Sequence, residues 1–566
     1  MFVVGDWQQG DSMKKLAKAQ IAAGILAACF NLGGGEAIAA PSLSQPGQDI
    51  QKELPKAEAE VVDNAPEKPQ QAPQVEFTIT NFRLEAPDLY LDKGDLTKIL
   101  QDGMGEKKTM TQLNATLTAL TRYCRQHGYP AAAAYVPAQE SSDGMITIKV
   151  IPGRYGEIKI DNRSRLKEGI AKGFVNGLKP GDIIRTGKLE TTLYSISDVS
   201  GTKAVGVLSP GKDFGTSDLT VRIERGKGSN TVLYVENYGS KDTGQYRYGL
   251  QENLYDVSGN GDKISVGGLI SNRGMHNYYV NYETIVGRGG ATLGVGISRM
   301  DYETGLQGMN MNGTAETFSV FGQRSLYHLT GSGMTVKYGY DHRRLKDKYS
   351  LFPTLNQEKK SHGFYVGLDG FERRMGFILN YSTRITTGSI SLDSGLGDRN
   401  NIEGRFTKGE FNVSAVQRLG NRADVLVKAS GQLASRNLDG SERMYLGGAN
   451  GVRAYPQGEG SGDAGLMGTI EPRFYTSVPG LVFSTYFDIG HVSYFKDGRT
   501  SRNYTSGTGV DSTGMTLKGC GAALSYTKPN DWFARLDYAR RIGGDPNLSE
   551  KAKAKGRLWF MLGKIW

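Results

Sequence analysis

The chain has 566 residues, which is too long for one ordinary soluble domain. Only 38% of the residues are apolar, while 77 glycines and 29 tyrosines indicate many tight turns between strands, because disordered segments are poor in aromatic residues. The net charge of +10 comes from Lys and Arg that are interspersed with Asp and Glu. Without a basic block that carries interleaved aromatic residues, this charge does not indicate nucleic-acid binding.

The first 39 residues have the pattern of a secretory signal peptide. A basic start at residues 13–15 (MKK) is followed by an apolar run at 21–30 and by the small-residue site AIA at 37–39. We expect cleavage after Ala39, with translation starting at Met1 or Met13. After this segment no apolar run reaches the ~20 residues of a membrane-spanning helix.

The residues that usually carry chemistry are scattered. Cys29, Cys124 and Cys520 form no CxxC pair, and the six histidines lack metal-ligand spacing. A lipoprotein box at 26–29, with Cys29 as the lipidated residue, is an alternative to the signal peptide. The glycine-rich run 458–465 has no βαβ unit around it and no Gly-Lys-Ser/Thr after it, so we reject a phosphate loop. We expect no catalytic residues, no metal and no cofactor, and therefore no enzyme.

Residues 40–75 are rich in Pro, Gln, Glu and Lys. Residues 48–54 fit a short polar helix, and residues 66–73 read as an extended polyproline-like linker. A disordered leader explains the same composition.

Two α+β units follow, at residues 76–152 and 153–229. In the first, a strand at 77–80 precedes a short helix at 95–101 and a longer helix at 110–127, in which Leu113, Leu117 and Leu120 recur at helical spacing. Strands at 131–136 and 145–151 complete a β-α-α-β-β order that resembles a POTRA domain. The second unit repeats this order, and units of about 75 residues are large enough to fold alone. Two generic α+β modules are the alternative.

From residue 230 to 566 the dominant pattern is period-two alternation. Leu293, Val295 and Ile297 alternate with small or polar residues, and in a strand successive side chains point to opposite faces. A soluble β-sandwich shows the same alternation, so the number of runs decides. Sixteen runs, an even number, predict a 16-stranded antiparallel transmembrane β-barrel; they begin near residues 231, 244, 262, 276, 290, 314, 333, 361, 376, 406, 423, 466, 481, 514, 531 and 557.

One connection in this region, at about residues 436–464, is far too long and glycine-rich for a hairpin turn. A barrel of sixteen strands leaves an aqueous channel unless something fills it, so we expect this loop to fold inward. Asp488 lies in the next strand but one and would be costly on the lipid side, which assigns it to the lumen. Arg453, in the loop, is then placed for a bidentate contact with Asp488. An exposed Arg453 without a partner is the alternative.

Several of these residues carry a resemblance to a known family. Val452-Arg453-Ala454-Tyr455 resembles the Val-Arg-Gly-Tyr loop motif of the Omp85 superfamily, and Tyr486-x-Asp488-x-Gly490 resembles its Phe-x-Asp-x-Gly strand motif. The match is to the two-partner secretion branch (TpsB proteins, the filamentous-haemagglutinin and haemolysin transporters). Ala454 and Tyr486 depart slightly from the motifs. Phe560 and the terminal Trp566 resemble the signal by which barrels are recognised for assembly.

The resemblance implies an outer-membrane transporter of a Gram-negative bacterium, with its POTRA domains in the periplasm and a plug helix and linker within residues 40–75. Its partners would be a secreted TpsA-type exoprotein (an adhesin, a haemolysin or a contact-dependent toxin), outer-membrane lipid and, during biogenesis, the barrel-assembly machinery. Export would proceed from a monomer without ATP. A barrel-assembly or insertion factor of the same superfamily is the alternative, and a passive diffusion porin is the alternative from another class.

Overall fold

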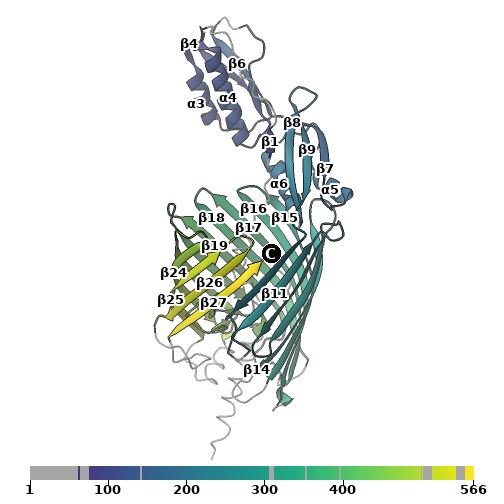
Figure 1. The fold of residues 1–566 in the computed structure, drawn as a ribbon, viewed down its shortest axis with the longest axis vertical. Coiled ribbons are helices and arrows are strands. Elements are labelled where there is room, and N and C mark those ends of the chain that lie inside the picture. The colour runs from purple at the N-terminus through teal and green to yellow at the C-terminus, as the bar shows by residue number, and fades with distance from the viewer. Residues whose placement is uncertain are drawn as a thin grey trace, which may run out of the picture.

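In the computed structural model the chain forms two α+β units and a barrel, which follow one another along the long axis of the molecule (Figure 1). The structure describes residues 61–63, 76–140, 143–199, 201–241, 243–304, 311–350, 353–393, 397–398, 400–498, 500, 513–543 and 555–566. The expected signal peptide and the helix at 48–54 lie outside these ranges, as do residues 66–73. Among the described residues no helix is both long and apolar enough to cross a membrane.

The first α+β unit packs two helices against short strands. Its longer helix α4 begins with a capping box, in which Thr109 and Gln112 satisfy each other's backbone N–H groups. The apolar stripe of α4 buries Leu113, Leu120 and Cys124 in the core of the unit. Burial raises the pKa of the Cys124 thiol to about 11, so this cysteine behaves as a core residue. The elements are β2 (Glu76–Ile79), β3 (Asn81–Glu85), α3 (Lys93–Gly103), β4 (Gly105–Thr109), α4 (Met110–Gln126), β5 (Ala133–Tyr135) and β6 (Met145–Ile151).

The second α+β unit has a four-stranded sheet in the order β1-β8-β9-β7, covered by α5 and α6. Its outermost strand β1 (Val61–Asp63) comes from the segment that we assigned wholly to the plug helix and linker, so for these three residues that assignment is wrong. β1 pairs in parallel with β8, where Val62 lies opposite Val207. The other elements are β7 (Arg154–Asn162), α5 (Glu168–Val175), α6 (Thr186–Ser197), β8 (Thr202–Pro210) and β9 (Thr216–Arg225).

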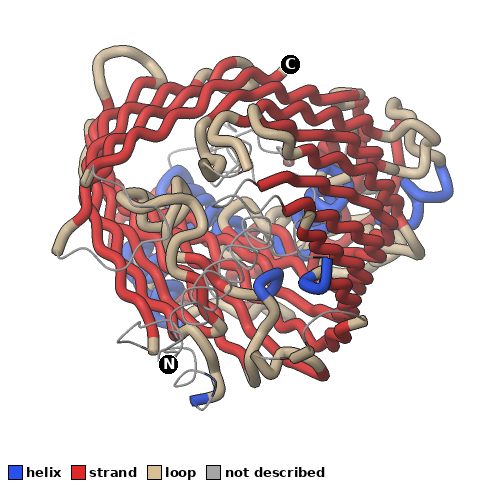
Figure 2. The backbone as a smooth tube through the Cα atoms, turned by 90° about the horizontal axis from the view of Figure 1, so that it is seen from below, coloured by secondary structure: helices blue, strands red, loops and turns tan. Residues whose placement is uncertain are grey.

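Sixteen antiparallel strands close into a barrel, as predicted, and each predicted run lies in one of them (Figures 1 and 2). Every strand pairs with its neighbour in the ring, so no edge remains, as a membrane barrel requires. The strands are β10 (Ser229–Glu236), β11 (Arg247–Tyr255), β12 (Lys263–Ser271), β13 (His276–Ile285), β14 (Thr292–Thr304), β15 (Met311–His328), β16 (Ser332–Tyr349), β17 (Gln357–Arg374), β18 (Phe377–Leu392), β19 (Gly404–Arg418), β20 (Ala423–Ala434), β23 (Ala464–Tyr475), β24 (Leu481–Ser493), β25 (Gly514–Thr527), β26 (Trp532–Arg541) and β27 (Gly556–Ile565).

Along the barrel strands, apolar side chains lie on one face and polar side chains on the other. On β14, Leu293, Val295 and Ile297 are 44%, 46% and 61% exposed, which places them on the outer surface of the barrel. On β24 the alternation places Asp488, 1% exposed, on the inner face. The outer face is therefore suited to lipid and the inner face to charge, as in outer-membrane barrels.

The second α+β unit contacts one end of the barrel. The His328 ring, at the end of β15, stacks on Tyr194 of α6 with ring centroids 4.3 Å apart, and its Nδ1 lies 2.8 Å from Asp198 Oδ2. Thr330 donates to Glu190 through both its backbone N–H and its hydroxyl. The turns beside this unit therefore lie at the end that the family resemblance places in the periplasm. The opposite turns, among them the one between β16 and β17, lie at the outer end.

The ring closes between the first and last strands. β10 and β27 share five register pairs, from Val232 opposite Ile565 to Glu236 opposite Met561, whereas β26 and β27 share nine. Asn237 prolongs this short seam: its Nδ2 donates to Leu558 O at 2.9 Å, and its Oδ1 accepts from Phe560 N at 2.7 Å. At the other end the Trp566 backbone N–H donates to Thr231 O at 3.0 Å.

We expect Asn237→Ala to weaken the barrel at its seam. The substitution removes two hydrogen bonds, and at about 1 kcal/mol each the loss is about 2 kcal/mol. The measurement is the temperature at which the purified barrel loses its heat-modifiable mobility. Asn380→Ala on β18 is the control, because no described residue hydrogen-bonds to its side chain. Equal shifts in both variants would contradict a special role of Asn237 at the seam.

Candidate functional site

The connection between β20 and β23, residues 435–463, lies inside the barrel, and we call it the lumen loop. Loop segments lie within the ring of strands in Figure 2. The loop folds on itself through a small hairpin, in which β21 (Met444–Tyr445) pairs with β22 (Ser461–Gly462). Between these strands, Val452 N donates to Leu446 O at 2.7 Å, so the tip is turned back toward the base. The tip is therefore a folded body rather than an extended segment.

Arg453, at the tip of the lumen loop, meets Asp488 of β24 in a bidentate contact. Its Nε lies 2.9 Å from Asp488 Oδ2, and its Nη2 lies 2.8 Å from Oδ1. The Arg453 backbone N–H also donates to Asp488 Oδ2, at 3.1 Å. Asp488 accepts a further hydrogen bond from Thr469. Both side chains are almost fully buried, so the carboxylate holds the loop through its backbone as well as its guanidinium.

Two further carboxylates converge on the same guanidinium. Arg453 Nη1 lies 2.9 Å from Glu471 Oε2 on β23 and 3.2 Å from Asp537 Oδ1 on β26. Arg535, also on β26, bridges these two carboxylates, at 3.0 Å from Glu471 and 2.8 Å from Asp537. Sequence reasoning did not identify Glu471 or Arg535 as site residues; the available signal was strand parity, which places both on the lumen face.

The remaining tip residues pack the loop against the wall. Val452, Ala454 and Tyr455 are each no more than 1% exposed. The guanidinium carbon of Arg453 lies 3.2 Å from the centroid of the Tyr486 ring, a cation–π contact that an aromatic residue supplies at this position.

Two glycines of the wall make room for the loop. A Cβ on Gly490 would lie 2.8 Å from Leu446 Cδ2, so Gly490 makes room for a side chain of the lumen loop. A Cβ on Gly519 would lie 2.6 Å from the Cβ of Ala454. The alanine at the position where the motif usually has glycine is therefore accommodated by a glycine on the facing strand β25.

The last strand also contacts the tip. Trp559 of β27 donates its indole N–H to the backbone carbonyl of Arg453 at 2.7 Å, and this tryptophan is 2% exposed. The two predicted assembly residues lie elsewhere: Phe560 packs near Tyr246, and Trp566 is half exposed. The tip thus touches β23, β24, β26 and β27.

The base of the lumen loop is held at the other side of the barrel, with the charges reversed. Asp439 Oδ2 lies 2.8 Å from Lys359 Nζ of β17. Glu442 lies 2.7 Å from Arg343 of β16 and 3.1 Å from Lys408 of β19. At the base the loop supplies anions and the wall cations, while at the tip the loop supplies the cation and the wall the anions. The loop therefore crosses the lumen and is held to the barrel wall by ion pairs at both its tip and its base. We call this arrangement the ionic strap.

This arrangement holds the lumen loop against the barrel wall and fills part of the lumen. The polar groups at the tip are three carboxylates that bind two guanidinium groups. Within the described ranges no group of three or more His, Cys, Asp or Glu side chains is placed to hold a metal ion. What the site can do is keep the loop seated, or release it when the ionic contacts are exchanged.

Comparison with known proteins identifies the family. A family model described as haemolysin secretion/activation protein ShlB/FhaC/HecB matches residues 215–517, more than half of the chain. The chain belongs to this family. A second model, described as POTRA domain, ShlB-type, matches residues 77–153. The protein is thus an outer-membrane transporter of two-partner secretion, in the Omp85 superfamily, with periplasmic POTRA domains, and its family acts with secreted TpsA-type exoproteins.

Individual relatives are distant but span the chain. The chain is 24% identical over 502 residues to heme/hemopexin transporter protein HuxB of Haemophilus influenzae, covering 86% of this chain and 88% of the relative. It is 21% identical over 478 residues to outer membrane transporter CdiB of Dickeya dadantii, covering 81% of each. The solved structure of CdiB from Escherichia coli covers 100% of both chains, with a TM-score of 0.64 at 17% identity, and shares the fold.

We expect Arg453→Ala to release the tip more completely than Asp488→Asn. The first variant leaves three buried carboxylates with only Arg535, at a cost of about 3–5 kcal/mol. The second leaves Arg453 bound to Glu471 and Asp537 and removes one charged acceptor, at about 1–3 kcal/mol. The measurement is single-channel conductance in planar bilayers, which rises as the loop leaves the lumen.

The matched control is Arg540→Ala, an exposed arginine on the outer face of β26. Conductance equal to wild type in Arg453→Ala would show that the three carboxylates do not seat the loop. An equal rise in Asp488→Asn would show that Asp488 alone, rather than the three carboxylates together, seats it.

Proposed function

We propose that this protein exports one large partner exoprotein through its barrel lumen without ATP, by releasing the lumen loop from its two ionic anchors. The observation that carries the proposal is the strap itself. A loop held by ion pairs at both walls is stable while the channel is closed. Its charged side chains can exchange their partners on the wall for charges on a passing chain. Folding of the cargo outside the cell would supply the direction of transport. In this mechanism the protein acts as a monomer and catalyses no reaction.

The test is expression with and without candidate exoproteins, followed by assay of the culture medium. Relatives named for heme/hemopexin transport make a haem- or hemopexin-binding exoprotein the first candidate cargo; an adhesin, a haemolysin or a contact-dependent toxin is the next. Delivery of the barrel to the membrane by the barrel-assembly machinery, through the terminal strand with Phe560 and Trp566, is part of the same proposal.

The second α+β unit offers the edge at which an unfolded exoprotein would be captured. An extended peptide can add a strand to a sheet edge through main-chain hydrogen bonds. In the sheet order β1-β8-β9-β7, the far edge strand β7 is partly covered by a bridge between Arg154 and Ile183. At the other edge, β8 is covered by only the three residues of β1. We propose that the exoprotein displaces β1 and pairs with β8.

The rival function, insertion of other barrels into the membrane, would use opening of the β10–β27 seam. The seam has only five register pairs, so its opening is a candidate mechanism. The likeness to BamA from Haemophilus ducreyi, with a TM-score of 0.52 at 13% identity, shows the shared fold alone. A diffusion porin has no use for two periplasmic units or for a strapped loop.

We expect an in-frame deletion of residues 76–152 to abolish export of the exoprotein while the barrel still reaches the outer membrane. The first α+β unit has its own core and contributes no strand to the barrel, so its removal leaves the ring intact. Exoprotein in the medium reports export, and heat-modifiable mobility in the outer-membrane fraction reports the barrel. Normal secretion by this variant would show that the first unit is dispensable.

We expect a disulfide between Val62→Cys and Val207→Cys to block export by locking β1 onto β8. The two positions are register partners, within reach of a disulfide in the oxidising periplasm. Export should fall to the level of the deletion variant and return when a reductant is added. The two single-cysteine variants are the controls. Normal export by the locked protein would sink the proposed use of the β8 edge, while leaving the transport function untouched.

A further inference from the structure

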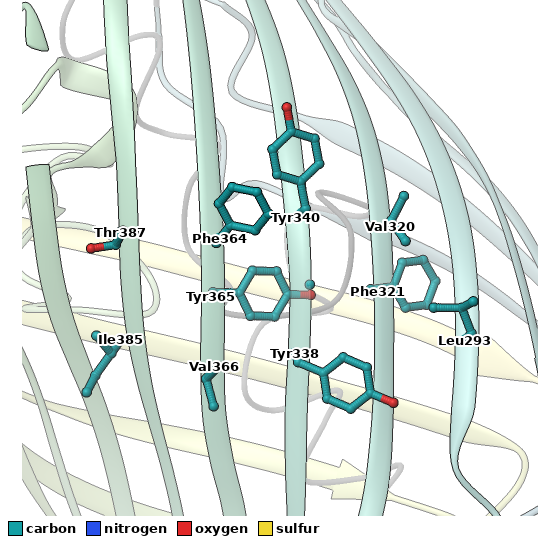
Figure 3. Close-up of a pocket in the computed structure, with 11 residues that line it drawn as sticks. Leu293, Val320, Phe321, Tyr338, Tyr340, Phe364, Tyr365, Val366, Ile385 and Thr387 are labelled. Carbon is teal, nitrogen blue, oxygen red and sulfur yellow. The ribbon is translucent and has the colours of Figure 1, made fainter. Parts of the chain in front are cut away.

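The outer face of the barrel carries a groove across strands β14–β18 (Figure 3). It encloses about 610 Å³ and is lined almost entirely by apolar and aromatic side chains. Tyr338 and Tyr340 point away from each other and open the groove between them, as Figure 3 shows. Phe364 and Ile385 are each 64% exposed, so this lining faces the lipid. A barrel wall that only has to be apolar toward the lipid does not need such a groove.

Above the groove, toward the outer turn, β16 and β17 carry three successive cross-strand pairs on the same face. Tyr340 lies opposite Phe364, His342 opposite His362, and Arg344 opposite Lys360. The Tyr340 hydroxyl lies 2.6 Å from His362 Nδ1, and the two histidine Nδ1 atoms lie 3.2 Å apart. Along the strand, Arg344 stands four residues from Tyr340, which is about 13 Å. Over that distance the surface changes from apolar through neutral polar to cationic.

In the uppermost pair Arg344 and Lys360 lie directly opposite each other, and neighbouring carboxylates decide how much of the like-charge repulsion remains. Of the two cations, Lys360 is bound to Asp393 at 2.5 Å. The carboxylates beside Arg344 are bound to other cations: Glu316, its register partner on β15, to Arg299 at 3.0 Å, and Glu358 to Lys346 at 2.5 Å.

Arg344 is exposed and forms no ion pair or hydrogen bond with any residue that the structure describes. A guanidinium beside an ammonium, on a lipid-facing wall above an apolar groove, is a receptor for an anion that carries a hydrocarbon chain.

We propose that this face binds one phosphorylated glycolipid of the outer leaflet, lipopolysaccharide, with a phosphate between Arg344 and Lys360 and an acyl chain in the groove. Arginine and lysine are the side chains that bind phosphate, and the guanidinium does so with two parallel hydrogen bonds. The two histidines lie at the level of the sugar and ester groups, to which imidazoles donate and from which they accept. The bound phosphate supplies Arg344 with an ionic partner and the acyl chain fills the hollow, so the lipid stabilises the barrel by linkage.

The test uses the full-length protein in detergent, titrated with diphosphoryl lipid A, with bound lipid counted by native mass spectrometry. We expect wild type to retain one lipid. Because both charge-assisted contacts to the phosphate become repulsive, Arg344→Glu/Lys360→Glu should weaken retention about tenfold or more. Phe364→Ala should also weaken it, through the groove.

The matched control is Lys518→Glu/Arg540→Glu, which reverses two exposed cations on the outer faces of β25 and β26. If the charge-reversed protein does not reach the membrane, Arg344→Gln/Lys360→Gln replaces it.

Two competition experiments identify the source of the bound anion. Phosphatidylglycerol should not compete at equal concentration, and inorganic phosphate should not displace the lipid. Displacement by inorganic phosphate would overturn the proposal in favour of a free-anion site. Unchanged retention in both the glutamate and the glutamine variants, or an equal loss in the control variant, would overturn it altogether.

Discussion

The structure depends on one guanidinium being shared among three carboxylates inside a membrane barrel. Arg453 reaches Asp488, Glu471 and Asp537, which come from three different strands. Buried acids at this spacing repel one another strongly, and they are tolerable only when cations occupy the space between them. Arg535 supplies one cation permanently from the wall. The second cation, Arg453, comes from the lumen loop. The three carboxylates of the wall therefore have both of their cations only when the loop is seated in the lumen.

The same logic, with the signs exchanged, holds the base of the loop. Lys359, Arg343 and Lys408 of the wall bind Asp439 and Glu442 of the loop. A loop held by hydrophobic packing alone would have to expose that packing to water when it moved. A loop held by ion pairs can leave the wall when water, salt or the charges of a passing polypeptide replace its partners, whereas removing one partner without replacement costs about 3–5 kcal/mol. Ionic straps at both ends therefore suit a channel that must be closed at rest and open for a large cargo.

The outer and inner faces of the barrel follow from a single constraint, the alternation of side chains along each strand. Charge is admitted inside, where the channel is polar, and at the outer rim, where headgroups lie. Arg344 and Lys360 stand at that rim above Phe364, while Arg343, the next residue along, points inward to Glu442. Two adjacent arginines thus serve opposite surfaces, one toward the lumen loop and one toward the lipid.

The sequence by itself determined the periodic and local features of this protein. Alternation marked all sixteen strands, because each strand carries its own lipid-facing side chains, and it assigned Asp488 to the lumen. Helical spacing of Leu113 and Leu120 marked the core of the first α+β unit.

What only the tertiary structure decided is where distant segments meet. Glu471 and Arg535 join the Arg453 cluster because β23 and β26 stand near each other in the closed ring, and ring geometry leaves no local trace in sequence. Likewise, Val61–Asp63 has no pattern that distinguishes it from a linker, since three residues gain their strand conformation only from the main-chain hydrogen bonds that β8 provides.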